Sequence, residues 1–412
     1  MSRPFVKLAL TLLLGLFAAA TFAQTTVRIT GYGGQDPAIV NRLINEVIGE
    51  TLSAEGITVQ YEPVEGDYNA GLFNSLSAGT AGDIFYIPAE TAPGILATGT
   101  VLPLNDVVDT EPFIDSLLEP FTQDGQIYGI AKDFNTLAVF YNEDLFDEAG
   151  VEYPNENDTW ETFAEKLRGV NDLGDDVQGA CFVADLARMA PFAFGEGWQT
   201  LSDEGTTNLQ DEAFVSAFNW YTGLIQEGVT VLPSDLGQDW GGGCFGTGNT
   251  GVAIEGAWIL GYLRDTAPNL QYGATFLPAG PSGEAGNYTY TVAYGINANS
   301  PNQEAAVTVL EALTSEAAQQ WVLENGLAIP SREALGDNPY FQEDSPEAQA
   351  NRVVFEGATR GNVEGYQFGT IGTDFVTPIN TAMTTVANGQ TETEAALEQA
   401  QSEVDALIQR AQ

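Results

Sequence analysis

The sequence contains no histidine, and this absence removes several classes of enzyme from consideration. Imidazole is the usual general base of serine and cysteine hydrolases and the commonest protein ligand of zinc. Catalytic triads that depend on histidine and most zinc sites are therefore excluded. The enzymes that remain are those that work with a pair of carboxylates.

Positive charge is also scarce, because the 412 residues include 13 lysines and arginines against 57 aspartates and glutamates, a net charge of -44 at pH 7. Such a surface repels nucleic-acid phosphates and anionic lipid, so we expect no nucleic-acid partner. The carboxylates are spread along the whole chain, which favours solubility in a saline medium over an acid-lined cation site. The calcium-loop spacing is missing, and we expect no metal and no cofactor.

Only two cysteines are present, Cys181 and Cys244. In an exported protein they would form one disulfide closing a loop of about 60 residues, worth roughly 3 to 4 kcal/mol by loop-closure entropy. Two buried thiols are the alternative. Both interpretations give the pair a structural role.

One long apolar run is present, at residues 8–20, and no later stretch approaches the roughly 20 residues that a membrane helix needs. Arg3 and Lys7 precede this run, and Thr21, Phe22 and Ala23 follow it. This pattern predicts a signal peptide over residues 1–23, cleaved after Ala23, and a soluble periplasmic protein. An uncleaved anchor is the alternative, and a lipid anchor is not expected because no cysteine follows the cleavage site.

The rest of the chain alternates between strand-like and helix-like segments. Residues 26–30 alternate in polarity and lead into a glycine-rich loop at 31–34, and helical spacing follows over 37–49. A strand over 57–61, a helical stretch over 68–78 and the apolar strand 83–87 follow, and this alternation predicts an α/β domain with a largely parallel, buried sheet. Ligands of such sheets bind beyond the carboxyl ends of the strands. Near the other end, residues 301–324 have the spacing of one long helix.

Tryptophan is informative because a flat ring can stack on the face of a sugar. Trp198, Trp240 and Trp258 lie near glycines or at strand ends, where a ring could serve as such a platform. Three others stand in helical spacing or at a helix start and are assigned to the core: Trp160, Trp220 and Trp321. Composition and pattern together indicate an exported two-domain α/β protein, either a binding protein or an enzyme.

The segment GQIYGIAKDFNTLAVFYNEDLFDEAGVEYPNENDTWETF, which begins at Gly125, resembles the bacterial extracellular solute-binding proteins of the maltose-binding type, the sugar-binding proteins of ABC transporters. The family pattern is a G-x-x-Y-G-x-P-like strand, then YN-x-x-x-F-x-x-AG and P-x-TW. Ala131 stands where the family commonly has proline, and Ile254 where methionine is common. Further segments match in the family's order: DIFYIPAE, LPLNDV, GVAIEGAW, INANSPNQEAA and AIPSR.

The resemblance implies an α/β, two-lobed periplasmic binding protein fold of type II, with two mixed sheets and flanking helices joined by a hinge. The implied division is residues 24–134 plus 293–329 for the N-terminal lobe and 135–292 plus 330–412 for the C-terminal lobe. The chain would cross between lobes at 134–136, 289–293 and 328–331.

The resemblance also implies a function: the substrate-binding component of an ABC importer, which closes around a mono- or oligosaccharide and presents it to the membrane permease subunits. Such a protein is a monomer and not an enzyme. Trp258 matches the family's stacking tryptophan, and Phe375 lies where a second stacking aromatic is found. The other implied ligand-binding residues are Glu90, Asp133, Asn135, Gln35, Asp36, Asp185, Arg188, Tyr366 and Gln367.

Three alternatives stay open at this point. The same fold could bind a polyamine, a glycerol phosphate diester or a metal chelate, although anionic ligands fit poorly with so few basic residues. A carboxylate-pair glycosidase is the alternative from a different class, and with 57 acidic residues a chance pair says little. A sensor domain that feeds a receptor is the third, because a receptor would also read the closed form.

Overall fold

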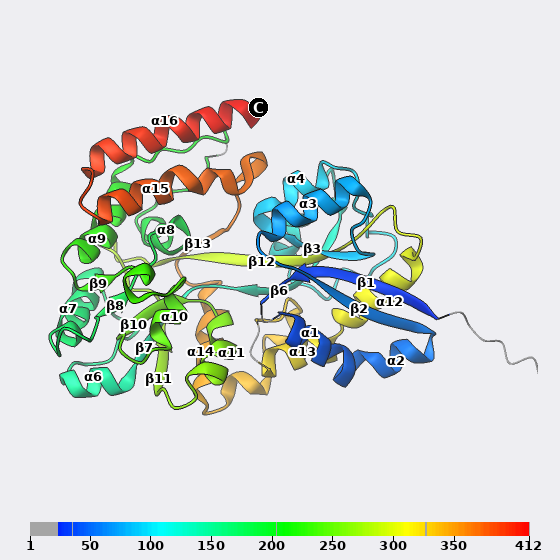
Figure 1. The fold of residues 1–412 in the computed structure, drawn as a ribbon, viewed down its shortest axis with the longest axis horizontal. Coiled ribbons are helices and arrows are strands. Elements are labelled where there is room, and N and C mark those ends of the chain that lie inside the picture. The colour runs from blue at the N-terminus through cyan, green and yellow to red at the C-terminus, as the bar shows by residue number, and fades with distance from the viewer. Residues whose placement is uncertain (1–23, 35, 203, 326–327, 412) are drawn as a thin grey trace, which may run out of the picture.

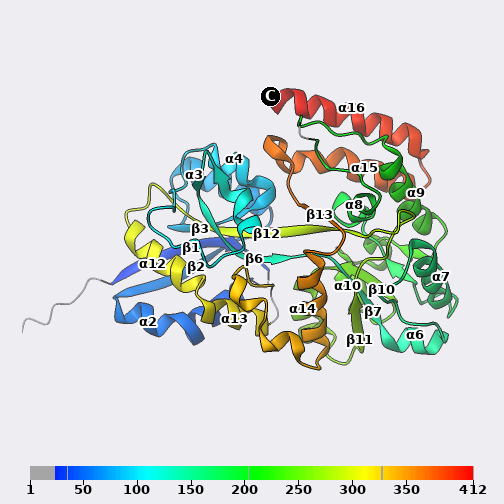
Figure 2. The same ribbon diagram turned by 180° about the vertical axis from the view of Figure 1, so that it is seen from behind.

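The computed structural model describes residues 24–34, 36–202, 204–325 and 328–411. The predicted signal peptide at 1–23 and the predicted ligand contact Gln35 lie outside these segments. Figure 1 shows the helices and strands gathered into two lobes, with the long strand β12 (Gly286–Ile296) and its neighbour β6 (Gly129–Asn135) running from one to the other. Figure 2 shows the same arrangement from behind. The two-lobed α/β fold is confirmed.

The first lobe is built on a six-stranded sheet of order β13-β12-β3-β1-β2, in which β6 also pairs with β12. Strands β1 (Thr25–Tyr32), β2 (Ile57–Val64) and β3 (Ile84–Pro88) are parallel, as the alternation predicts, and β12 is antiparallel to β3. β3 is buried at every residue, as expected of a central strand. The other elements of this part are α1 (Asp36–Leu43), α2 (Gly49–Ala54), α3 (Tyr68–Ala78), α4 (Ala92–Leu96), α5 (Asp115–Leu118), β4 (Thr122–Gln123), β5 (Gln126–Ile127), α12 (Gln303–Leu313) and α13 (Glu316–Glu324). Strand β13 (Asn362–Gly365) pairs with residues 286–289 of β12, at the end of β12 that lies in the second lobe.

The long helix expected over 301–324 is two helices, α12 and α13. Ser315 accepts a hydrogen bond from the Ala318 N–H at 3.3 Å and begins the second helix. Apolar residues keep their helical spacing through the break. A serine can cap a new helix or stand within a continuous one, so the sequence pattern did not separate one helix from two. The expectation of a single helix was therefore wrong.

The second lobe is built on a five-stranded sheet of order β11-β7-β10-β8-β9. This sheet is mixed, since β7 is antiparallel to β10 and β11, whereas β8 is parallel to β9 and β10. In both views α15 (Val376–Ala387) and α16 (Thr393–Ala411) lie side by side at the outside of the second lobe. The elements are β7 (Ala138–Asn142), α6 (Glu143–Ala149), α7 (Trp160–Asn171), β8 (Ala180–Cys181), α8 (Leu186–Gly195), α9 (Glu212–Gln226), β9 (Thr230–Val231), α10 (Gly241–Phe245), β10 (Val252–Glu255), α11 (Trp258–Thr266), β11 (Tyr272–Thr275), α14 (Pro346–Gly357), α15 (Val376–Ala387) and α16 (Thr393–Ala411).

Three chain segments between the lobes lie side by side. In β6 and β12, Phe134 pairs with Thr291 and Asn135 with Tyr290. On the other edge of β6, the Phe134 N–H donates to the Ile329 carbonyl at 2.9 Å, and the Ile329 N–H donates back at 3.1 Å. The crossings expected at 134–136, 289–293 and 328–331 thus form one hydrogen-bonded ribbon. The division of the chain into lobes at these residue bounds stays a prediction.

Cys181 in β8 and Cys244 in α10 form a disulfide with their Cα atoms 6.2 Å apart, which confirms the first of the two interpretations. Among the described helices, none combines the length and apolar character that a membrane crossing needs.

Candidate functional site

A cavity of about 270 Å³ lies between the lobes, beside the ribbon of crossing segments. This volume is at the small end of the roughly 300–1,000 Å³ that is usual for small-molecule sites. Six residues predicted from the sequence are in its lining: Asp36, Glu90, Asp133, Asn135, Trp258 and Tyr366. The other lining residues are Tyr32, Lys132, Tyr290, Thr291, Val292 and Ala328.

The wall from the first lobe carries the charge of the site. The Lys132 ammonium donates to the Asp133 carboxylate, and the two side chains are only 9% and 8% exposed. Lys132 also lies over the ring of Tyr86, 5.0 Å from its centroid. Burial lowers the pKa of Lys132, but the charges of Asp133 and Asp36 outweigh burial and leave that pKa raised, so the ammonium stays protonated.

Two further carboxylates on this wall lack a cation partner. Neither Asp36 nor Glu90 forms an ion pair within the described segments, and the buried Oδ2 of Asp36 has no hydrogen-bond donor there. Burial raises the pKa of Asp36, and it raises the pKa of Glu90 from 4.5 to about 7. A buried acceptor without a donor costs about 1–3 kcal/mol, so this wall favours a ligand that brings hydroxyl or ammonium donors.

The wall on the side of the second lobe is aromatic. Trp258 is the first residue of α11, directly after β10, and the edge of its ring packs against Tyr290 with 5.6 Å between centroids and planes at 89°. Tyr290 in turn lies 4.9 Å from the ring of Tyr366. The Tyr290 hydroxyl is held by donation to the Ala187 carbonyl at 2.9 Å. These rings give the cavity a rigid, flat and mainly apolar side.

Asn135 connects the two walls at the ribbon. It is the last residue of β6, and its Oδ1 accepts the backbone N–H of Ala257 at 3.0 Å, one residue before Trp258. The polar side chain expected at the first crossing thus lines the cavity and fixes the start of the helix that carries the tryptophan.

Four predicted ligand contacts are absent from the lining. Phe375 is fully buried and stacks on Phe368, 5.0 Å between centroids, in the core of the second lobe. Gln367 is half-buried and outside the lining. Asp185 accepts the Arg188 backbone N–H as the cap of α8, and Arg188 pairs with Glu255 at 2.7 Å. The structure therefore does not bring these four to the cavity.

Lys132, Tyr32 and Tyr290 are lining residues that sequence reasoning missed. Lys132 is one of two lysines after residue 23, and its rarity was the signal available. Tyr290 belongs to the run Tyr288–Thr289–Tyr290, whose alternation identifies a strand but not its ligand-facing side.

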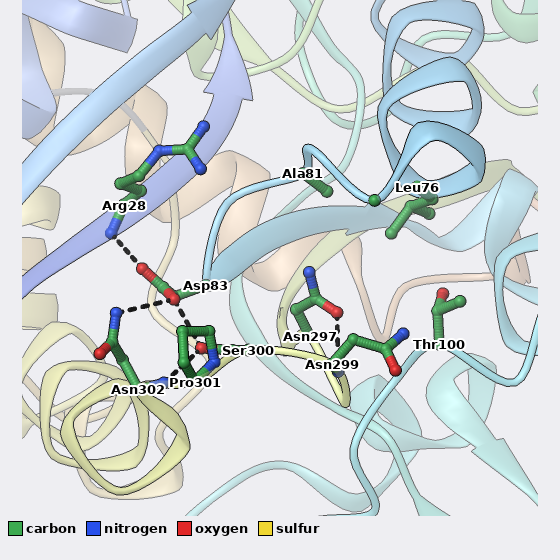
Figure 3. A pocket seen from close by; sticks show the side chains of 11 residues that line it. Arg28, Leu76, Ala81, Asp83, Thr100, Asn297, Asn299, Ser300, Pro301 and Asn302 are labelled. Carbon is green, nitrogen blue, oxygen red and sulfur yellow. Dashed lines mark hydrogen bonds between the residues drawn. The ribbon is translucent and has the colours of Figure 1, made fainter.

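A second pocket, of about 300 Å³, lies in the first lobe (Figure 3). Asp83 is one of its lining residues. The Asp83 carboxylate accepts hydrogen bonds from the backbone N–H of Arg28 at 2.8 Å, the Ser300 hydroxyl at 2.5 Å and the Asn302 amide at 3.2 Å. Asp83 thus joins β1 and β3 to the start of α12, and its acceptors are already occupied by the protein. We therefore assign it a structural role.

No cluster of three or more histidine, cysteine, aspartate or glutamate side chains suited to a metal occurs in the segments described.

Comparison with known proteins identifies relatives with the same fold. The family described as bacterial extracellular solute-binding protein matches residues 50–349. A putative binding protein of Brucella abortus is 26% identical over 379 residues, which is 89% of this chain and 90% of the relative. The galactooligosaccharide-binding protein of Bacillus subtilis is 24% identical over 342 residues, 78% of this chain and 76% of the relative.

Among solved structures, an ABC substrate-binding protein of Listeria monocytogenes in complex with cycloalternan superimposes with a TM-score of 0.83. The two chains are 19% identical, and the match covers 94% of this chain and 99% of the other. At this level of identity the likeness shows a common fold.

Proposed function

Because the chain belongs to the bacterial extracellular solute-binding proteins, we propose that it is the substrate-binding component of an ABC importer and binds a mono- or short oligosaccharide between its lobes. One observation carries the proposal: an aromatic wall faces, across one small cavity, a wall on which Asp36 and Glu90 have no cation partner within the described segments. Pyranose rings have apolar faces and hydroxyl edges, which suit these two walls respectively. The relative named for galactooligosaccharides and the complex with cycloalternan support this ligand class.

Each wall has its own part in binding. A sugar ring stacks on Trp258. Asp36 and Glu90 accept hydrogen bonds from its hydroxyl groups, and Lys132 donates a hydrogen bond to a hydroxyl oxygen. Asn135 supplies its amide at the ribbon. We propose no covalent step, so the carboxylates act as hydrogen-bond acceptors rather than as an acid and base pair.

Closure of the lobes completes the site. The single turn Ala89–Thr91, which carries Glu90, packs against the turn Gly369–Phe375 of the second lobe. A ligand favours this arrangement only to the extent that it binds the closed form more tightly than the open form. The membrane permease subunits would read that closed form, with the protein exported and acting as a monomer.

A small cationic solute such as a polyamine is the second candidate. Asp36 and Glu90 favour it because both carboxylates lack a cation partner within the described segments, and an ammonium group would supply one. Polyamine affinity would fall steeply with added salt, whereas stacking and neutral hydrogen bonds would be little affected.

The test is a thermal-shift screen of the exported protein against mono-, di- and trisaccharides and against polyamines, since a ligand of the native state raises Tm. A shift with one class of sugar supports the proposal and names the class. A shift with polyamines alone replaces the ligand, and no shift across the panel contradicts the proposal. Turnover of aryl glycosides that disappears when Glu90 or Asp36 is replaced would instead show a glycosidase.

A further inference from the structure

The tryptophan platform is held by a buried group of charges outside the cavity lining, which we call the anchor cluster: Asp185, Arg188 and Glu255. Glu255 ends β10, three residues before Trp258, and is completely buried. Its Oε2 accepts the indole Nε1–H of Trp258 at 2.9 Å and a guanidinium N–H of Arg188 at 2.7 Å. One carboxylate oxygen therefore joins the platform to the cluster.

Arg188 is itself fixed in place. Its backbone N–H donates to one oxygen of Asp185 at 2.9 Å, and its guanidinium donates to the other at 3.4 Å. The guanidinium carbon lies 5.8 Å from the centre of the Trp258 ring. The charges of Glu255 and Asp185 raise the pKa of Arg188 despite its burial, so the guanidinium stays protonated.

The remaining contacts of Trp258 lead to the ribbon between the lobes. The residue before it, Ala257, donates its backbone N–H to Asn135 of β6, and the ring packs edge-on against Tyr290 of β12. Neither contact involves the indole N–H. Rotation of the ring away from Glu255 would break the hydrogen bond between the indole N–H and this fully buried carboxylate, which is costly because the carboxylate is shielded from water.

We propose that Glu255 is a positioning residue: through the indole N–H it sets the orientation of the Trp258 ring in the cavity, and thereby the affinity for a stacked ligand ring that Glu255 never touches. The orientation itself is independent of what the ligand is. The effect on affinity rests on the proposed sugar-binding function.

The first test needs no ligand. Tryptophan fluorescence is measured for the wild type, Glu255→Gln, Trp258→Phe and the double variant, so that subtraction isolates Trp258 from the five other tryptophans. Glu255→Gln should change the emission maximum and the acrylamide quenching of the Trp258 component and leave spectra in the Trp258→Phe background unchanged. A Trp258 component that is identical with and without Glu255 would overturn the proposal.

The second test is a double-mutant cycle on binding, measured by calorimetry with glucose, maltose, maltotriose, galactobiose and arabinobiose. Glu255→Gln should weaken the tightest of these probes roughly tenfold, and in the Trp258→Phe background by less than about twofold. Equal weakening in both backgrounds would show that Glu255 acts without Trp258 and would reject the inference. If Trp258→Phe leaves affinity unchanged, or no sugar binds, the proposed site fails, and the fluorescence result alone decides the positioning role.

Two further variants separate positioning from loss of structure. Glu227→Gln also removes a carboxylate paired with an arginine in the second lobe, Arg168 at 2.8 Å, but far in the sequence from Trp258, and it should leave both fluorescence and affinity unchanged. If Glu255→Gln does not fold, Glu255→Asp keeps the charge for Arg188 while withdrawing the oxygen from the indole. This shorter variant should produce the same change in the Trp258 component.

Discussion

In the proposed function, the two walls of the cavity bind by different physical means. The first-lobe wall contains the ionisable groups Asp36, Glu90, Lys132 and Asp133, whereas the second wall consists of the rings of Trp258, Tyr290 and Tyr366. Hydrogen bonds to the first wall depend on protonation and on the positions of hydroxyl groups. Stacking on the second wall depends on the area and orientation of the rings rather than on the positions of hydroxyl groups. The difference suggests that the aromatic wall supplies affinity for sugars in general and the charged wall selects among them.

The largest expected effect comes from replacing the one cation of the charged wall. Lys132→Met would leave Asp133 buried without its partner, and breaking a buried pair in this way costs about 3–5 kcal/mol. Urea denaturation at pH 7.5 measures the loss. The exposed pair in the same lobe offers a control, since Arg42→Met should change stability by less than about 1 kcal/mol. Similar stability of wild type and Lys132→Met would show that the charged wall does not depend on its cation.

Removing the platform should have the next largest effect, this time on binding. Trp258→Ala deletes the flat face of the aromatic wall, and we expect affinity for the best sugar of the panel to fall roughly 30-fold or more. Calorimetry measures it, with circular dichroism to establish folding. Trp321→Ala is the control, because that half-buried ring packs with Arg42 in the first lobe and is outside the lining. Unchanged affinity in a folded Trp258→Ala variant would remove the aromatic wall from the site.

A smaller effect is expected from neutralising one acceptor of the charged wall. Glu90→Gln keeps the shape of the side chain but supplies one acceptor oxygen and an amide in place of two acceptors. Affinity for different sugars should change by different factors, each below roughly tenfold. Calorimetry on epimeric sugars such as glucose and galactose measures the ratio. If both affinities fall equally, Glu90 contributes no selection between them.

The smallest effect is a dependence on pH. Burial raises the pKa of Glu90 from 4.5 to about 7, so the folded protein binds this proton more tightly than the unfolded chain. The contribution of Glu90 to stability is therefore greatest below pH 4.5 and is lost as the pH rises through about 7. Denaturation at pH 5 and pH 8 should show this loss in the ligand-free wild type and less of it in Glu90→Gln. An equal change in both proteins would assign the pH dependence to other groups.

Binding and this ionisation should be linked. A sugar hydroxyl that donates to the Glu90 carboxylate favours the charged form, so binding near pH 7 should release protons. Calorimetry in two buffers of different ionisation enthalpy measures the number released, and Glu90→Gln should abolish the difference between buffers.

The sequence predicted the first lobe well because its signals are local. The helix expected over residues 68–78 coincides with α3, and the strand expected over 83–87 overlaps β3. Glycine and apolar periodicity determine such elements within a few residues of chain. The break between α12 and α13 was missed because its cap, Ser315, lies within uninterrupted apolar spacing.

For the site, position relative to a strand end was the useful signal. Glu90, Asn135 and Trp258 each stand at or just after the end of a strand, and each lines the cavity. Phe375 and Arg188 lie in helical regions, where the direction of a side chain depends on how the helices pack, and neither reaches it. The burial of Lys132 could not be predicted, because a lone lysine is ordinarily exposed and only the fold reveals its partners.

The ribbon of crossing segments bears on how well the two walls of the cavity would keep their alignment through repeated opening and closing. Phe134 pairs with Thr291 of β12 on one edge and exchanges two hydrogen bonds with Ile329 on the other, so the three segments form one leaf that bends more easily across its plane than it shears within it. In the closure proposed above, bending along such a leaf would separate the two walls and return them to the same alignment in every cycle. Recognition would then be encoded once, when the chain folds, and repeated in each proposed transport event without adjustment.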